Sequence, residues 1–124
     1  MRFLKIFSAF LFFAFLTSET KATHIKAADL YAKVNPGNLT TSNAHRIIQY
    51  TLNVYADKKS VDVAQGSGCD GLGNCAELDF GDGSKSGNLN YFTRTDVGNN
   101  TYLLVYYFIH TYPSDGFYEA NYID

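Results

Sequence analysis

Asp79-Phe80-Gly81-Asp82-Gly83 is the stretch that decides the fold, because it predicts a strand end followed by a tight corner. Over residues 76–80, apolar side chains alternate with acidic ones, which is the period of a strand with one buried face. Gly81 and Gly83 can adopt positive φ, and Asp82 between them can accept hydrogen bonds within its own turn. The pattern therefore indicates a strand and turn, with a structural role for the aspartates.

Two chemical roles compete with this structural one. Asp79 and Asp82 would serve as an acid–base pair only if they faced each other across a cleft, as in glycosidases, and a small domain offers little cleft. Ca²⁺ prefers oxygen ligands, and Asp70, Asn74, Asp79 and Asp82 are close in sequence, although their spacing does not match an EF-hand loop. Calcium at Asp70, Asp79 and Asp82 is thus a minority hypothesis. We otherwise expect no cofactor and no catalytic residue.

Residues 1–22 have the pattern of a secretory signal peptide. Arg2 and Lys5 precede an apolar run over residues 6–16, and Thr20-Lys21-Ala22 supplies the small residues that signal peptidase reads. The run is shorter than the ~20 residues of a membrane-spanning helix. We expect cleavage before Thr23 and no membrane span afterwards. A retained anchor helix or an N-terminal core helix is the alternative.

Residues 23–124 are long enough for one domain with one modest core. They contain seven Lys and Arg against eleven Asp and Glu, a formal net charge of −4. Because basic residues cluster only at Lys58-Lys59, we do not expect a nucleic-acid partner. The chain stops in or just after an expected strand, which indicates a domain truncated at its C-terminal end.

Cys69 and Cys75 are the two cysteines of the chain, and they enclose a short loop. In a secreted protein this spacing predicts a disulfide that holds a hairpin tip. A redox or metal pair is the alternative, but further cysteines or a nearby histidine are lacking.

Two segments have the clearest strand pattern. In residues 45–57 apolar side chains alternate with polar ones, while residues 101–110 are apolar or aromatic on both faces, which is typical of a central strand. We expect the face formed by Leu103, Val105, Tyr107 and Ile109 to be buried. The opposite face would then expose Tyr102, Tyr106 and Phe108, either for sugar or protein contact or beneath a neighbouring segment.

Weaker strand patterns occupy most of the remaining chain. Residues 24–33 read as an edge strand, and further short strands are expected in segments 61–63, 76–80, 88–94 and 117–123. We find no helical period after residue 22. The sequence therefore predicts an all-β antiparallel sandwich of about seven strands, preceded by the signal-peptide helix.

Three motifs resemble the PKD domain: Leu78-Asp79-Phe80-Gly81-Asp82-Gly83-Ser84, His110-Thr111-Tyr112 and Gly116-Phe117-Tyr118. Ala22-Thr23-His24-Ile25 and Val54-Tyr55-Ala56-Asp57 are similar to the N-terminal module of gliding-motility-associated or type IX-secreted Bacteroidetes surface proteins. The chain departs from the family in having Leu78 where tryptophan is usual, and in its cysteine loop. A C-terminal sorting domain, which such proteins often carry, is not among these residues.

The resemblance implies an immunoglobulin-like sandwich over residues 23–124. It assigns the structural motif to Asp79, Gly81, Asp82, Gly83, His110, Tyr112, Gly116 and Tyr118. It also implies a secreted or cell-surface module for adhesion or spacing, whose partners are other domains of the same protein or a cell-surface protein or glycan. The alternative is a carbohydrate-binding accessory domain of a secreted hydrolase, and an enzyme in its own right is the third hypothesis. Fold-level analogy does not choose among them.

Overall fold

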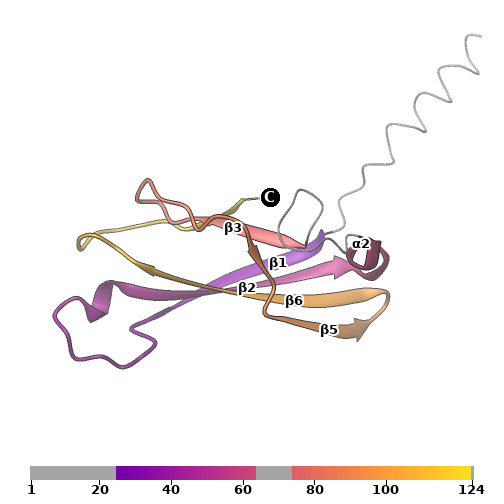
Figure 1. Ribbon diagram of the computed structural model, residues 1–124, viewed down its shortest axis with the longest axis horizontal. Helices are drawn as coiled ribbons and strands as arrows, with labels where there is room; N and C mark the ends of the chain where they lie inside the picture. The colour runs from indigo at the N-terminus through magenta and orange to yellow at the C-terminus, as the bar shows by residue number, and fades with distance from the viewer. Residues whose placement is uncertain (1–24, 64–73, 124) are drawn as a thin grey trace, which may run out of the picture.

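The computed structural model describes residues 25–63 and 74–123, in which seven strands form two antiparallel sheets (Figure 1). The larger sheet has the order β1-β2-β6-β5, with β1 (Ile25–Val34), β2 (Ile47–Asp57), β6 (Thr101–Thr111) and β5 (Thr93–Gly98). The smaller has the order β4-β3-β7, with β4 (Leu89–Asn90), β3 (Cys75–Asp79) and β7 (Asn121–Ile123). The predicted all-β architecture of two antiparallel sheets is confirmed.

Strands β2 and β6 form the centre of the larger sheet, paired without interruption from Ile47–Thr111 to Asp57–Thr101. Residues directly opposite each other in an antiparallel pair share a face, so each strand contributes every second side chain to the core. The buried side chains on this face are Tyr50, Leu52, Val54 and Ala56 of β2 and Tyr102, Leu104, Tyr106 and Phe108 of β6.

The smaller sheet covers this face through the apolar side of β3. Ala76, Leu78 and Phe80, the three apolar positions of the predicted alternation, are all buried, and Leu78 has no exposed surface. Leu78 thus fills the position at which the PKD resemblance leads one to expect tryptophan. Figure 1 shows β3 in a separate layer from β1, β2, β6 and β5.

The segment expected to hold one strand over residues 88–94 instead contributes to both sheets. β4 pairs with β3 in the smaller sheet, and β5 pairs with β6 in the larger one. The chain changes sheets between them, over Tyr91 and Phe92. The hairpin from β5 to β6 then turns at Asn99 and Asn100, both with φ of 54°, as a turn with two left-handed residues requires.

One prediction was wrong: residues 61–63 form no strand, because Lys58–Val63 is a short helix, α2. Asp57 starts it by accepting hydrogen bonds from the backbone N–H and the hydroxyl of Ser60, both at 3.1 Å. Val61 is buried in the core at 1% exposure. A helix of less than two turns shows no period in the sequence, which explains the error. Within the described residues, no helix is long and apolar enough to cross a membrane.

Candidate functional site

The corner after β3 is built by the two aspartates that the sequence singled out. Asp79 Oδ1 accepts a hydrogen bond from the Gly81 N–H at 2.9 Å, and Asp82 Oδ1 accepts one from the Ser84 N–H at 3.0 Å. The Ser84 hydroxyl donates to the same Asp82 oxygen at 2.5 Å. Gly81 and Gly83 both have positive φ, at 81° and 91°. Each aspartate therefore closes a turn of its own, as expected of Asp next to Gly.

The second oxygen of Asp82 joins this corner to the larger sheet. His110 Nε2, on β6, lies 2.7 Å from Asp82 Oδ2. Since an ionised carboxylate can only accept, the ring donates this hydrogen bond. The hydroxyl of Ser84 and then the ring of His110 lower the pKa of Asp82 from 3.8 to about 2. Asp82 is thus held as a carboxylate with both oxygens bonded.

Aromatic rings surround the Asp82–His110 contact. The Phe80 ring stacks on the His110 ring at 4.0 Å between centroids, with an angle of 3° between their planes. Tyr112 packs edge-on against His110 at 4.6 Å, and its hydroxyl donates to the Phe80 carbonyl at 2.8 Å. The Tyr50 hydroxyl lies 2.5 Å from the Tyr112 hydroxyl. The pKa of Tyr112 is raised, mainly by burial.

The last two motif residues extend this cluster toward β7. The Tyr118 ring stacks on Tyr112 at 4.1 Å, and its hydroxyl donates to the Ser114 carbonyl at 2.9 Å. Gly116 lies close to the Tyr118 ring, where an added Cβ would approach ring atoms at 3.3 Å. All eight residues of the predicted structural motif are therefore brought into one continuous region.

The calcium candidates are engaged elsewhere or lie outside the described residues. Asp79 Oδ1 and Asp82 Oδ1 accept hydrogen bonds within their own turns. Asp82 Oδ2 accepts a hydrogen bond from His110. Asp70 is outside the described residues. Among residues 25–63 and 74–123, no group of three His, Cys, Asp or Glu side chains is arranged to hold a metal ion. Asp79 and Asp82, the alternative acid–base pair, each use one carboxylate oxygen to close a turn within the corner.

The predicted disulfide involves one described residue. Cys75, the first residue of β3, is disulfide-bonded in the structure. Cys69, its predicted partner, lies outside the described residues.

The predicted contact face on β6 was wrong, because Tyr102, Tyr106 and Phe108 point into the core. Their exposures are 8%, 3% and 2%. Tyr106 donates a hydrogen bond to the Asn74 carbonyl at 2.6 Å, and burial raises its pKa. The Tyr102 hydroxyl donates to Asp62 at 3.1 Å. Since both faces of β6 are apolar, alternation alone did not reveal which one packs inward.

The exposed face of the larger sheet carries the other β6 residues. Tyr107 and Ile109 are 44% and 68% exposed. Phe92, at 75% exposure, packs edge-on against Tyr107 with 5.4 Å between ring centroids. On β1, Tyr31 lies opposite Thr51, which itself lies opposite Tyr107, so all three share this face. The β2 residues on this face are the polar Gln49, Thr51 and Asn53, which would indicate an outward face only once the register of β2 with β6 is known.

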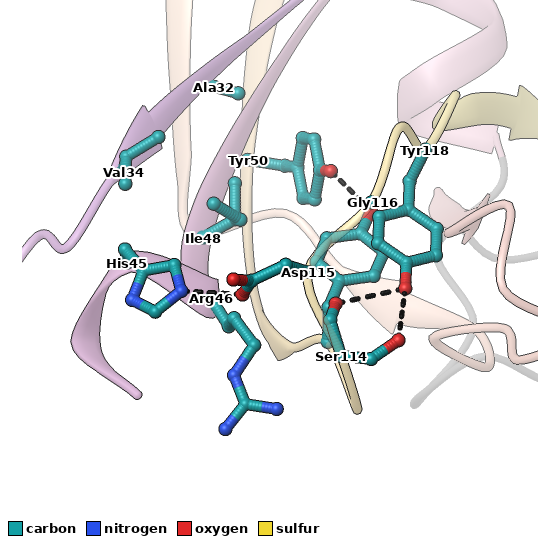
Figure 2. A pocket seen from close by; sticks show the side chains of 11 residues that line it. Ala32, Val34, His45, Arg46, Ile48, Tyr50, Ser114, Asp115, Gly116 and Tyr118 are labelled. Atoms are coloured by element: carbon teal, nitrogen blue, oxygen red, sulfur yellow. Dashed lines mark hydrogen bonds and ion pairs between the residues drawn. The ribbon is translucent and has the colours of Figure 1, made fainter. Parts of the chain in front are cut away.

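A pocket of about 330 Å³ lies on the opposite face, between the larger sheet and residues 112–118 (Figure 2). Apolar side chains of β1 and β2 line one wall: Ala32, Val34, Ile48 and Tyr50. In Figure 2 the His45 ring and the Asp115 carboxylate meet beside this wall, 2.5 Å apart. Arg46 donates to the Pro113 carbonyl at 2.6 Å. No sequence pattern predicts this pocket, because its two walls are more than sixty residues apart in the chain.

Comparison of the chain with protein-family models, with curated proteins and with solved structures finds no match.

Proposed function

We propose that residues 25–123 are an immunoglobulin-like sandwich of PKD type, serving as a non-catalytic module of an exported protein. In immunoglobulin domains one sheet has the strand order A-B-E-D, and the other contains C′, C and F as neighbours. The orders β1-β2-β6-β5 and β4-β3-β7 follow this scheme. The Tyr118 hydroxyl bonded to the Ser114 carbonyl, just before β7, resembles the tyrosine corner that precedes strand F.

The observation that carries a structural role is the bond between Asp82 and His110. These are the residues of the motif best suited to acid–base chemistry. The imidazole of His110 is hydrogen-bonded to the carboxylate of Asp82, so each functional group is already engaged. The side chains of Asp82 and His110 are 7% and 17% exposed, so solvent has little access to the contact. A pKa of about 2 keeps Asp82 ionised and makes it a poor proton acceptor near neutral pH. This supports a scaffold whose function lies on its surface.

Export is supported by the N-terminal sequence pattern. Localisation at the cell surface is supported by the resemblance to Bacteroidetes gliding-motility modules. The test is to express the full chain in a bacterium and to determine the N-terminus of the product outside the cytoplasm. A product that begins at Thr23 supports the proposal. A product that keeps residues 1–22 and stays with the cells contradicts it.

A carbohydrate-binding accessory domain is the second candidate, and the exposed aromatic side chains of the larger sheet favour it. Tyr31, Phe92 and Tyr107 are 58%, 75% and 44% exposed, and aromatic rings on an open sheet can stack on sugar rings. A glycan array probed with the full chain separates the candidates. Binding that is lost in Tyr107→Ala but kept in Thr95→Ala, an exposed threonine of the neighbouring strand, supports carbohydrate recognition. An array without signal supports the adhesion or spacer role.

A further inference from the structure

The pocket between the larger sheet and residues 112–118 has a charged rim beside its apolar wall (Figure 2). The rim consists of three side chains, His45, Arg46 and Asp115. The volume of about 330 Å³ corresponds to roughly ten water molecules at ~30 Å³ each, and so to a ligand of about ten non-hydrogen atoms. The pocket therefore has the size of a site for a small molecule.

The tyrosine hydroxyls in the pocket have already used their protons. The Tyr112 hydroxyl donates to the Phe80 carbonyl, so it accepts from the hydroxyl of Tyr50. In the same way, the Tyr118 hydroxyl donates to the Ser114 carbonyl and accepts from the Ser114 hydroxyl. These four hydroxyls offer a ligand only acceptors. An anionic group would therefore find its hydrogen-bond donors at the rim.

Arg46 carries a positive charge that the carboxylates of the described residues leave unpaired. Its Nη1 donates to the Pro113 carbonyl at 2.6 Å, which is a neutral acceptor. The ion pairs within residues 25–63 and 74–123 use other cations, namely His45, Lys58, Arg94 and His110. A guanidinium has five N–H donors in a planar fork and binds a carboxylate through two of them at once. Arg46 is half-buried, so such a pair would be partly shielded from water.

The one carboxylate of the rim is already engaged. Asp115 Oδ1 lies 2.5 Å from Nε2 of His45. A cationic ligand would have to compete with His45 for Asp115, whereas an anionic ligand competes at Arg46 only with a carbonyl. The charges of the rim therefore favour an anion.

We propose that this pocket binds a small organic carboxylate with an apolar body, of about ten non-hydrogen atoms in all. The carboxylate pairs with the guanidinium of Arg46, and the apolar body lies against Ala32, Val34 and Ile48. This site adds a ligand-binding function to the proposed scaffold. It lies on the opposite face of the larger sheet from Tyr107, so it is also separate from the proposed glycan surface.

The experiment titrates the ¹⁵N-labelled full chain with three probes that share one phenylpropyl skeleton. Hydrocinnamate is the anion, hydrocinnamide is neutral, and phenylpropylamine is the cation. We expect hydrocinnamate to shift the amide signals of Arg46, Ile48 and Asp115 at millimolar concentration. It should bind at least tenfold more tightly than either other probe, because only the carboxylate forms charge-assisted hydrogen bonds with the guanidinium.

Variants of the rim test the sign of the charge. Arg46→Gln should weaken hydrocinnamate binding tenfold or more, and Arg46→Lys should restore part of it. Asp115→Asn should bind hydrocinnamate at least as tightly as the unmodified chain, because a like charge is removed. Arg94→Gln is the matched control, since Arg94 pairs with Asp62 outside the pocket, and should leave binding unchanged.

Variants of β1 test the position of the apolar body. Ala32→Phe should weaken hydrocinnamate binding tenfold or more, because the new ring occupies the space over the apolar wall. Ala27→Phe makes the same change opposite Tyr55, on the outer face of the strand, and should leave binding unchanged. Both alanines are exposed, so thermal unfolding should confirm that both variants fold.

Four results would overturn the proposal. The first is no shift with hydrocinnamate at millimolar concentration, and the second is equal affinity for hydrocinnamate and hydrocinnamide. The third is tighter binding of phenylpropylamine, with its loss in Asp115→Asn, which would make this a cation site. The fourth is nuclear Overhauser contacts in the unliganded chain that place another segment of the polypeptide in the pocket. Each of these results would leave the proposed scaffold role intact, because that role depends on Asp82 and His110.

Discussion

The imidazole Nε2 of His110 lies 2.7 Å from Oδ2 of Asp82, and this contact joins the two sheets of the sandwich. His110 belongs to β6 at the centre of the larger sheet, whereas Asp82 lies in the corner after β3 of the smaller sheet. Phe80 stacks on the same imidazole, so one side chain holds the corner by both a hydrogen bond and ring packing.

Replacing His110 by alanine should lower the melting temperature by about 5–10 °C, because a charge-assisted hydrogen bond and a stacked ring are lost together. Calorimetry or circular dichroism measures the change. His45→Ala is the matched control, since its bond to Asp115 is between side chains 58% and 75% exposed, and should change the melting temperature little. Equal effects of the two variants would show that His110 has no special structural role.

Gly81→Ala should unfold the domain or destabilise it by about 3 kcal/mol or more, as expected for a steric clash in a packed structure. Gly81 has a φ of 81°, and an added Cβ would collide with the backbone carbonyl of Glu119. Gly83→Ala, with a φ of 91° and no atom near the added Cβ, should lose only about 1 kcal/mol from positive φ. Urea unfolding compares them, and similar losses would argue against close packing of Glu119 on the corner.

Leu104→Ala and Leu103→Ala test which face of β6 packs inward. Leu104 is 1% exposed in the core, so its truncation should destabilise the domain by about 3 kcal/mol. Leu103, half-buried on the outer face, should lose about 1 kcal/mol or less. Urea unfolding of both variants checks this, and a larger loss for Leu103 would reverse the assigned orientation of the strand.

The free energy of unfolding should fall between about pH 4 and pH 2, partly through Asp82. Its pKa is lowered from 3.8 to about 2 in the folded state, so the stability it contributes is complete above 3.8 and is lost as pH falls through 2. Asp82→Asn should flatten this part of the profile, whereas Asp115→Asn, at a carboxylate 75% exposed, should not. Urea unfolding from pH 2 to 7 measures both. An unchanged slope in Asp82→Asn would contradict the role of its hydrogen bonds.

The corner could be predicted from sequence because its information is local. Gly81 and Gly83 flank Asp82, and the aspartate hydrogen bonds that close the two turns join residues only two positions apart. The strands β2 and β6 were equally accessible, since alternation over about ten residues is a strong signal. The prediction of an all-β antiparallel sandwich followed from the number of short segments with a strand pattern along the chain.

The orientation of β6 and the helix α2 could not be predicted for physical reasons. Tyr106 and Tyr107 are both aromatic, so the inward face of β6 depends on which partners β2 and β3 offer, which is long-range information. Helix α2 depends on one capping contact of Asp57 and one buried residue, Val61, and these leave no pattern. The pocket likewise arises only when β1 and residues 112–118 meet in space.

The most direct test of the account is a crystal structure of the full chain. We expect two antiparallel sheets with the orders β1-β2-β6-β5 and β4-β3-β7, and His110 bonded to Asp82 between them. A structure in which these strands are replaced by helices, or in which Asp79 and Asp82 line an open cleft opposite another acid or base, would contradict it.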